Sequence, residues 1–175
     1  FFKSDRYLGG AWKAMPADLS RPRLGWRVLD LMDDMSNWEA KKYIVGEVDI
    51  FQVDRTTEFY GHANVNYLRL DHIPHFEDGW ASVLKALRDG AFFLSTGEVL
   101  MPRFTIGGRQ SGETLKVGSP ERVKLEADLN WTFPMSFAEV VTGDGNKVYR
   151  ERIDLSGTGA FGKQTLKMEV DLKGK

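Results

Sequence analysis

The chain has 175 residues, of which 42% are hydrophobic and 28% are charged, and its formal net charge is −1. This composition is typical of a soluble globular protein, and the balanced charge favours neither nucleic acid nor an anionic membrane as a partner. The absence of cysteine excludes disulfides, thiolate metal sites and cysteine nucleophiles. No apolar run approaches the roughly 20 residues of a membrane-spanning helix, and a secreted or periplasmic location stays open.

The first residues contain neither an initiator methionine nor the order of a signal peptide. We therefore expect the natural protein to begin upstream of Phe1, which makes the upstream part of the same polypeptide an expected partner. Residues up to about Asp18 carry Gly9-Gly10 and Pro16 and are interpreted as an extended surface loop.

Two amphipathic helices are predicted, both in the first half of the chain. The first begins near Ser20, ends at Ser36-Asn37, and places on one face Leu24, Val28, Leu31, Met32 and Met35. The second begins near Glu77-Asp78, ends at Gly90, and places on one face Trp80, Val83, Leu84 and Leu87. Between them, residues 43–53 and 64–70 are rich in β-branched and apolar side chains and predict two strands.

After Ala91 the hydrophobic period becomes that of strands. Apolar residues alternate with polar ones in two segments, at Val123, Leu125, Ala127, Leu129 and Trp131, and at Leu166, Met168, Val170 and Leu172. This alternation predicts antiparallel sheets with one buried face, packed on each other in a sandwich of about six or seven strands. Residues 143–146, Gly-Asp-Gly-Asn, predict a hairpin turn, and Gly107-Gly108 and residues 157–159 predict further turns.

The predicted fold class is therefore α+β: a partial α/β segment with two helices, followed by an immunoglobulin-like antiparallel β-sandwich. The boundary is expected near Ser95-Thr96-Gly97, where the mixed pattern gives way to strands alone. This divides the chain into residues 1–95, a remnant of an α/β domain, and residues 96–175, an accessory β-sandwich.

An acidic cluster is the best candidate for chemistry. Glu47 and Asp49 are two residues apart, so in a strand they project from the same face. Asp54, Glu58 and His62 follow within a short stretch. Carboxylate and imidazole ligands suit a divalent zinc, manganese or iron ion, and we take Asp49, Glu47 and His62 as candidate ligands. The alternative is a polar strand face paired with Lys or Arg, with His62 in a turn.

Other patterns favour structural roles. His72 and His75 flank Pro74 and are interpreted as surface residues of a connecting loop. Residues 107–112 are glycine-rich but lack the Lys-Ser/Thr of a phosphate-binding loop, and predict a hairpin turn. An aromatic platform for a glycan would use Trp131, Phe133, Phe137 and Phe161, but Trp131 lies on the apolar side of its strand, which favours core packing.

One segment resembles a known family. Residues 80–97 (WASVLKALRDGAFFLSTG) resemble a recurrent segment of the carbaryl-hydrolase-like branch of the PHP (polymerase and histidinol phosphatase) superfamily. In that branch a Trp-led helix ending in Leu-Arg-x-Gly is followed by an aromatic strand, a turn and a sandwich. The Gly46–Phe51 stretch is similar in position to the family's Gly-Ser-Asp-x-His motif, so Asp49 matches the metal-binding aspartate and Phe51 stands where the histidine belongs.

The resemblance implies that the parent protein is a metal-dependent hydrolase or phosphoesterase and that this chain is its catalytically incomplete C-terminal part. The family's His-x-His motif would lie upstream of Phe1, and residues 96–98 lack the family's Asn and Pro. We therefore expect a degenerate member, truncated at both ends. The second hypothesis is a non-catalytic β-sandwich that binds a small molecule, a glycan or a partner protein.

Overall fold

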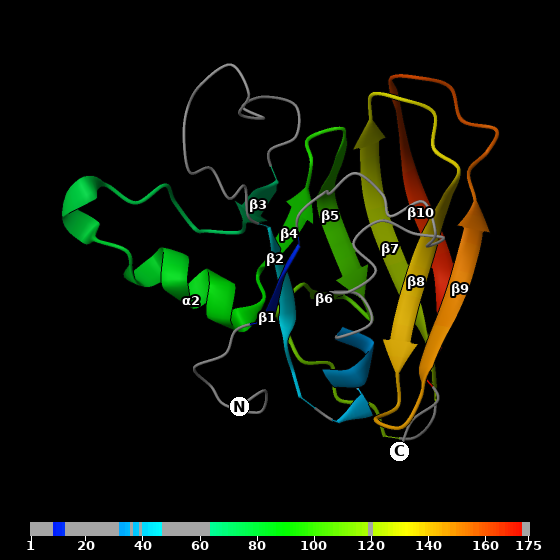
Figure 1. The fold of residues 1–175 in the computed structure, drawn as a ribbon, viewed down its shortest axis with the longest axis horizontal. Helices are drawn as coiled ribbons and strands as arrows, with labels where there is room; N and C mark the ends of the chain where they lie inside the picture. The colour runs from blue at the N-terminus through cyan, green and yellow to red at the C-terminus, as the bar shows by residue number, and fades with distance from the viewer. Residues whose placement is uncertain are drawn as a thin grey trace.

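The structure is a computed structural model, which describes residues 9–12, 32–35, 37–38, 40–46, 64–118 and 121–172. Within these ranges the fold is β-rich, with mostly antiparallel strand pairs and little helix (Figure 1). The prediction of antiparallel sheets after Ala91 is confirmed at this level. The division of the chain at residues 95 and 96 stays a prediction. A short turn at residues 96–98 links the strands on either side.

A four-stranded sheet forms the centre of the strand-rich region. Its order is β10 (Gly162–Leu172), β7 (Glu121–Trp131), β5 (Val99–Ile106) and β6 (Arg109–Gln110). β10 and β7 pair antiparallel along their whole length, from Gly162 opposite Trp131 to Leu172 opposite Glu121. The predicted alternation is confirmed, because one face carries the buried core cluster Val123, Leu125, Ala127 and Val170.

β5 contains an irregularity that its sequence explains. The β5–β7 register shifts between Leu100 and Arg103, where Pro102 lies in the strand. Proline has no N–H to donate to a ladder, so a bulge at this position removes the need for that hydrogen bond. β5 then turns into β6 through Gly107 and Gly108, both at positive φ, as a two-residue hairpin turn requires. The predicted turn at this position is confirmed.

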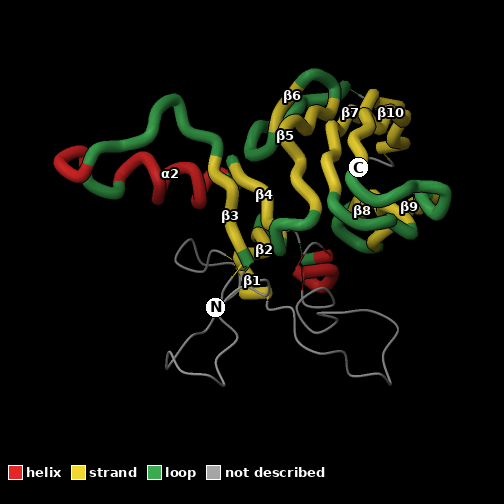
Figure 2. The backbone as a smooth tube through the Cα atoms, turned by 90° about the horizontal axis from the view of Figure 1, so that it is seen from above, coloured by secondary structure: helices red, strands yellow, loops and turns green. Residues whose placement is uncertain are grey.

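A hairpin of β8 (Phe137–Gly143) and β9 (Val148–Asp154) lies against the apolar face of this sheet. Val140 of β8 packs on the core cluster, and Figure 2 shows the hairpin as a separate layer. Asp144 organises the predicted turn: its Oδ1 accepts the N–H groups of Asn146 and Lys147, each at 2.8 Å, and its Oδ2 accepts the Tyr149 hydroxyl at 2.9 Å. The hairpin prediction is confirmed.

The first half of the chain forms two short strand pairs. β1 (Gly9–Trp12) runs parallel to β2 (Tyr43–Gly46), and β3 (Val65–Leu68) runs antiparallel to β4 (Phe92–Ser95). The prediction of a loop up to Asp18 is wrong at β1, because pairing with β2 outweighs the low strand preference of Gly9 and Gly10. The predicted strand over residues 43–53 is confirmed for β2, and residues 47–53 lie outside the described ranges.

The helices differ in part from the prediction. Residues 32–35 and 37 are helical, while residues 20–31 and Ser36 lie outside the described ranges. The second helix was predicted to begin near Glu77, but a 3-10 turn η1 (Phe76–Asp78) precedes it and α2 spans Ala81–Asp89. Gly79, at φ 66°, breaks the helical path between them. The predicted end at Gly90 is confirmed by its left-handed conformation, φ 74°.

Candidate functional site: an apolar cavity

A cavity of about 750 Å³ lies where the short strands meet the four-stranded sheet. Its walls come from residues near the helical turn at 32–35, from β2, from β4 and the turn after it, and from β5 and β7. The lining residues are mostly aliphatic or aromatic: Met32, Lys42, Tyr43, Ile44, Gly90, Phe92, Phe93, Leu94, Ser95, Thr96, Val99, Met101 and Leu129. Met101 also packs on the core cluster, so the cavity adjoins the core on the same side of the sheet.

One wall depends on contacts between β2 and the end of α2. The Tyr43 hydroxyl donates to the carbonyl of Asp89 at 3.0 Å, and its ring meets Phe92 edge-to-face at 6.0 Å. Gly90 lies under the Tyr43 ring, and a Cβ atom at Gly90 would come within 2.3 Å of that side chain. Gly90 is therefore required twice, for the left-handed helix end and for the close approach of the tyrosine.

Two polar side chains of the described lining, Ser95 and Thr96, are engaged within the β4–β5 turn. The Ser95 hydroxyl donates to the carbonyl of Val99 and accepts the Gly97 N–H at 2.9 Å. The Thr96 hydroxyl donates to the Glu98 carboxylate. Among the described residues that line the cavity, Lys42 is the charged one. A cavity with these walls has the chemistry of a site for an apolar molecule, since a sugar would need several polar partners.

A second cavity of about 580 Å³ shares Phe92, Phe93 and Met101 with the first. Its other lining residues include Tyr67, whose ring stacks on Phe93 at 4.8 Å with the planes 4° apart. Arg103 also contributes to this cavity. The aromatic residues of β4 thus lie between two hollows, which makes this short strand the centre of the candidate site.

Arg103 belongs to an ionic network on the outer face of the sheet. Its guanidinium donates to both oxygens of Asp128, at 2.8 and 3.1 Å, and to Glu126 at 3.0 Å. Thr165 and Lys124 complete the network at 2.6 and 3.0 Å from Asp128 and Glu126. Hydrogen bonds from Arg103 and Thr165 lower the pKa of Asp128 to about 2, and those from Lys124 and Arg103 lower the pKa of Glu126. Both carboxylates are therefore engaged in side-chain contacts that join neighbouring strands of the sheet.

The candidate metal ligands Glu47, Asp49 and His62 all lie outside the described residues, as do Asp54 and Glu58. In the part of the chain that the structure describes, no three His, Asp or Glu side chains gather in a way that could hold a metal ion.

The remaining residues singled out in the sequence have structural positions. His72 and His75 are exposed on the loop before α2, as predicted, and the His75 N–H donates to Asp78 at 2.8 Å. Trp131 is 7% exposed and its indole N–H donates to the Gly159 carbonyl at 2.8 Å, so the prediction of core packing is confirmed. A glycan platform would have to use Phe133, Phe137 and Phe161, which are all exposed.

The sequence pattern did not predict the cavity. The only local signal is the unbroken apolar run Phe92-Phe93-Leu94, which places large side chains on both faces of a short strand. Such a run is ambiguous, because a strand buried on both faces has the same sequence as one that borders a cavity.

The described fold and site define a β-rich protein with an apolar cavity beside its main sheet. Comparison of the chain with protein-family models, with curated proteins and with solved structures finds no significant match. Among the described residues no helix has the length and apolarity needed to cross a membrane.

Proposed function

We propose that this chain is a non-catalytic binding domain whose ligand is a small, largely apolar molecule held in the 750 Å³ cavity. The apolar lining beside β4 is the observation that carries this proposal. The volume of the cavity lies within the roughly 300–1,000 Å³ common for small-molecule sites. The hydroxyls of Ser95 and Thr96 already bond within the protein, which favours an apolar ligand over a glycan. Hydroxyl groups of a glycan that are buried without partners would lower its affinity.

The architecture that would support this role is an immunoglobulin-like sandwich, in which the β8–β9 hairpin forms part of the second sheet. The contact of Val140 with the core cluster supports this arrangement. The strand-rich region would then act as the rigid support, and the β2–β4 region as the wall that admits the ligand.

Binding of the neutral fluorophore N-phenyl-1-naphthylamine would test the cavity. We expect saturable binding to the full chain with a blue-shifted emission. Thr96→Trp should fill the rim of the cavity and weaken binding by about tenfold, equivalent to about 1.4 kcal/mol. A matched control is Thr132→Trp, an exposed position that follows β7 and does not line the cavity.

Two results would contradict this proposal. One is unchanged affinity in Thr96→Trp, provided that circular dichroism shows the native fold. The other is calorimetric binding of a glycan such as cellohexaose without any binding of the fluorophore, which would favour the carbohydrate-binding alternative.

A second candidate function is that of the C-terminal part of a PHP-like metal-dependent hydrolase, catalytically incomplete by itself. The acidic residues Glu47 and Asp49 and the resemblance of residues 80–97 favour it. A divalent zinc, manganese or iron ion would then bind through Asp49, with Glu47 and His62 as further ligands.

Metal analysis of the purified full chain by plasma mass spectrometry separates the two candidates. The hydrolase candidate predicts a near-stoichiometric metal that is lost in Asp49→Ala and retained in Asp71→Ala, an exposed aspartate before α2. If the protein stays metal-free after exposure to zinc, manganese and iron ions, only the binding role remains.

A further inference from the structure

The second feature with functional meaning is the arm, defined here as residues 69–90: the loop after β3, the η1 turn and α2. Figures 1 and 2 show from two directions that the arm extends away from the sheets. Its bonds to the described part of the body lie at its inner end, such as Arg69 N–H to the Ala91 carbonyl at 2.8 Å and the Tyr43 hydroxyl to the Asp89 carbonyl at 3.0 Å.

The outer part of the arm exposes large apolar side chains in a continuous stretch of sequence. Phe76 is 96% exposed, Ile73 is 89% exposed and Trp80 is 73% exposed. Leu84, one turn along α2 from Trp80, is 48% exposed. Isolated exposed apolar residues are common, but four within twelve residues on one projecting element are a feature of interaction surfaces.

Local structure does not require these side chains. Trp80 occupies the N-cap of α2 without a side-chain hydrogen bond to the helix, at a position where a serine or aspartate would stabilise the helix better. Phe76 begins η1, a turn that holds itself together through its backbone and Asp78. The aromatic side chains at these positions therefore contribute little to the fold of the isolated arm.

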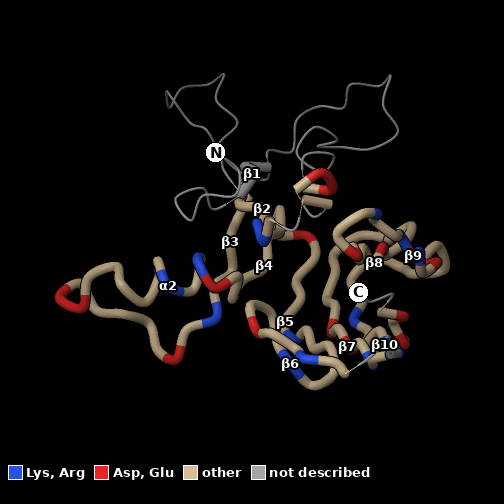
Figure 3. The backbone as a smooth tube through the Cα atoms, turned by 90° about the horizontal axis from the view of Figure 1, so that it is seen from below, with Lys and Arg blue, Asp and Glu red and all other residues tan. Residues whose placement is uncertain are grey.

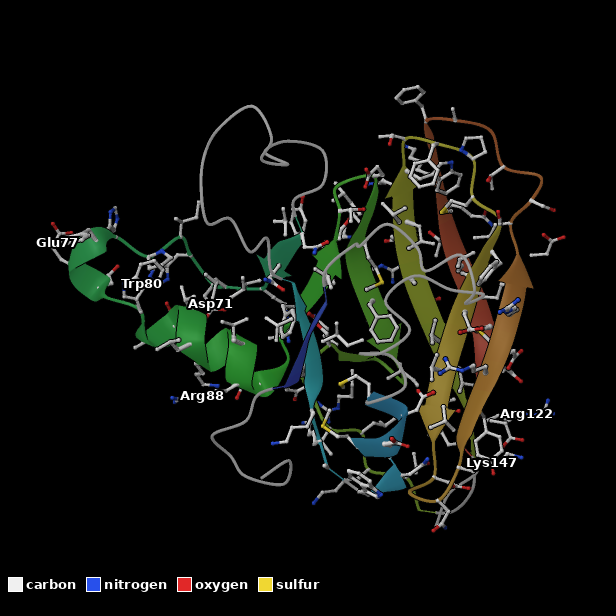
Figure 4. The ribbon with its side chains drawn as sticks, in the orientation of Figure 1. Asp71, Glu77, Trp80, Arg88, Arg122 and Lys147 are labelled. Carbon is white, nitrogen blue, oxygen red and sulfur yellow. The ribbon has the colours of Figure 1, made fainter. Side chains whose placement is uncertain are left out.

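The outer tip of the arm is acidic, and its inner end carries charges of both signs. Glu77 and Asp78 lie at the tip, while Lys85 and Arg88 lie on α2, where Lys85 pairs with Asp89, and Asp71 lies on the inner part of the loop (Figures 3 and 4). Glu77 and Arg88 mark the two ends in Figure 4, with Trp80 between them. An acidic tip opposes docking to an anionic membrane. The arm complements a surface on which the same charge pattern runs in the opposite direction.

We propose that the arm is a self-association surface on which a second copy of this chain docks its own arm antiparallel. A two-fold axis near Trp80 brings the apolar side chains of both copies together at the centre. The same axis places the acidic tip of each copy beside Arg88 of the second copy. Such an interface is isologous, since each contact occurs twice, and it leaves the sheets and the cavity of both copies accessible.

Sedimentation velocity of the full chain over a range of concentrations tests the proposal. We expect a reversible dimer, and Phe76→Ser with Trp80→Ser should raise its dissociation constant by about tenfold or more, as for central aromatic interface residues. Because both side chains are largely exposed, the double variant should keep its melting temperature. The control is Phe133→Ser with Phe161→Ser, two exposed aromatics outside the arm, which should dimerise normally.

Charge reversal distinguishes specific pairing from general stickiness. Glu77→Lys and Arg88→Glu should each weaken the dimer, because each places like charges together at both ends of the interface. The combined variant restores opposite charges and should recover most of the affinity. A chain that is monomeric at all concentrations overturns the proposal. A dimer whose affinity does not change with the arm substitutions also overturns it. So does a monomer whose tryptophan fluorescence shifts on phosphatidylcholine vesicles in the native chain but not in Trp80→Ser.

Discussion

The four-stranded sheet and the β2–β4 region are held together in different ways. In the sheet, β7 and β10 pair over eleven consecutive positions and share a buried cluster centred on Val123 and Val170. In the β2–β4 region each strand has only four residues, and β2, which pairs with β1, is joined to β3 and α2 by single side chains such as Asn66 and Tyr43. The cavity lies where these two kinds of structure meet.

This difference bears on how a binding site can be built. A long ladder with a continuous core leaves little space and opens only with global unfolding. Short strands tied by a few side-chain contacts leave gaps and can adjust locally when a ligand enters. We therefore expect substitutions in the sheet to change global stability, and substitutions in the β2–β4 region to change local protection and binding.

The largest effect is expected from Trp131→Ala. The indole is buried, donates to the Gly159 carbonyl and lies over Gly162, where a Cβ atom would come within 2.2 Å of its ring. Loss of this side chain should lower the free energy of unfolding by about 3–5 kcal/mol, as for other buried aromatic residues. Urea denaturation would measure the change. Phe133→Ala, at a site 46% exposed, is the control and should cost less than about 1 kcal/mol; equal losses would show that Trp131 is not part of the core.

The sheet could be predicted from its sequence because its information is local and periodic. The alternation from Val123 to Trp131 sets which face is buried, and the turn residues at 143–146 set the hairpin. The bulge at Pro102 was not predicted, although proline within a strand is a signal for one.

The β2–β4 region could not be predicted to the same extent, because its contacts join residues distant in sequence. The Asn66 side chain bonds to Gly46 and the Tyr43 hydroxyl bonds to Asp89, and no periodicity encodes either pair. β1 lacked a strand pattern of its own and is defined by its partner β2. The cavity follows from such long-range contacts, so only its apolar residues, and not its existence, could be read in the sequence.

A smaller, local effect is expected from Asn66→Ala. The Asn66 amide accepts the Gly46 N–H at 2.8 Å and donates to the Gly46 carbonyl at 3.0 Å, as a neighbouring strand would do. Two partly buried hydrogen bonds of this kind contribute about 1–3 kcal/mol together. Hydrogen exchange should therefore show faster exchange of the Gly46 amide, with most β7 and β10 amides unchanged.

The control for this experiment is Val65→Ala, the neighbouring strand residue, which is 41% exposed. It should leave the Gly46 amide protected. If Asn66→Ala instead accelerated exchange throughout the sheet, the two regions would unfold as one unit, and the contrast between them would not hold.

The smallest effect is expected in the acid range and concerns the outer face of the sheet. Asp128 has a pKa lowered to about 2 by Arg103 and Thr165, below the value of about 3.9 for an unfolded chain. The folded state therefore favours the ionised carboxylate. This contribution to stability is fully present above about pH 4 and is lost as the pH falls through about 2.

Arg103→Met removes the principal cause of this shift, so the pKa of Asp128 should return towards its ordinary value. The variant should melt at a lower temperature than the native chain near neutral pH, and the difference should shrink as the pH falls from about 4 to about 2. Melting curves across this range would measure the difference.

Arg122→Met is the matched control, because Arg122 and Glu169 are 3.8 Å apart with both side chains more than two-thirds exposed, and such pairs contribute little. Parallel pH profiles for native and Arg103→Met chains would mean that the network on this face is screened by solvent. The stability of the sheet would then reside in its apolar face alone.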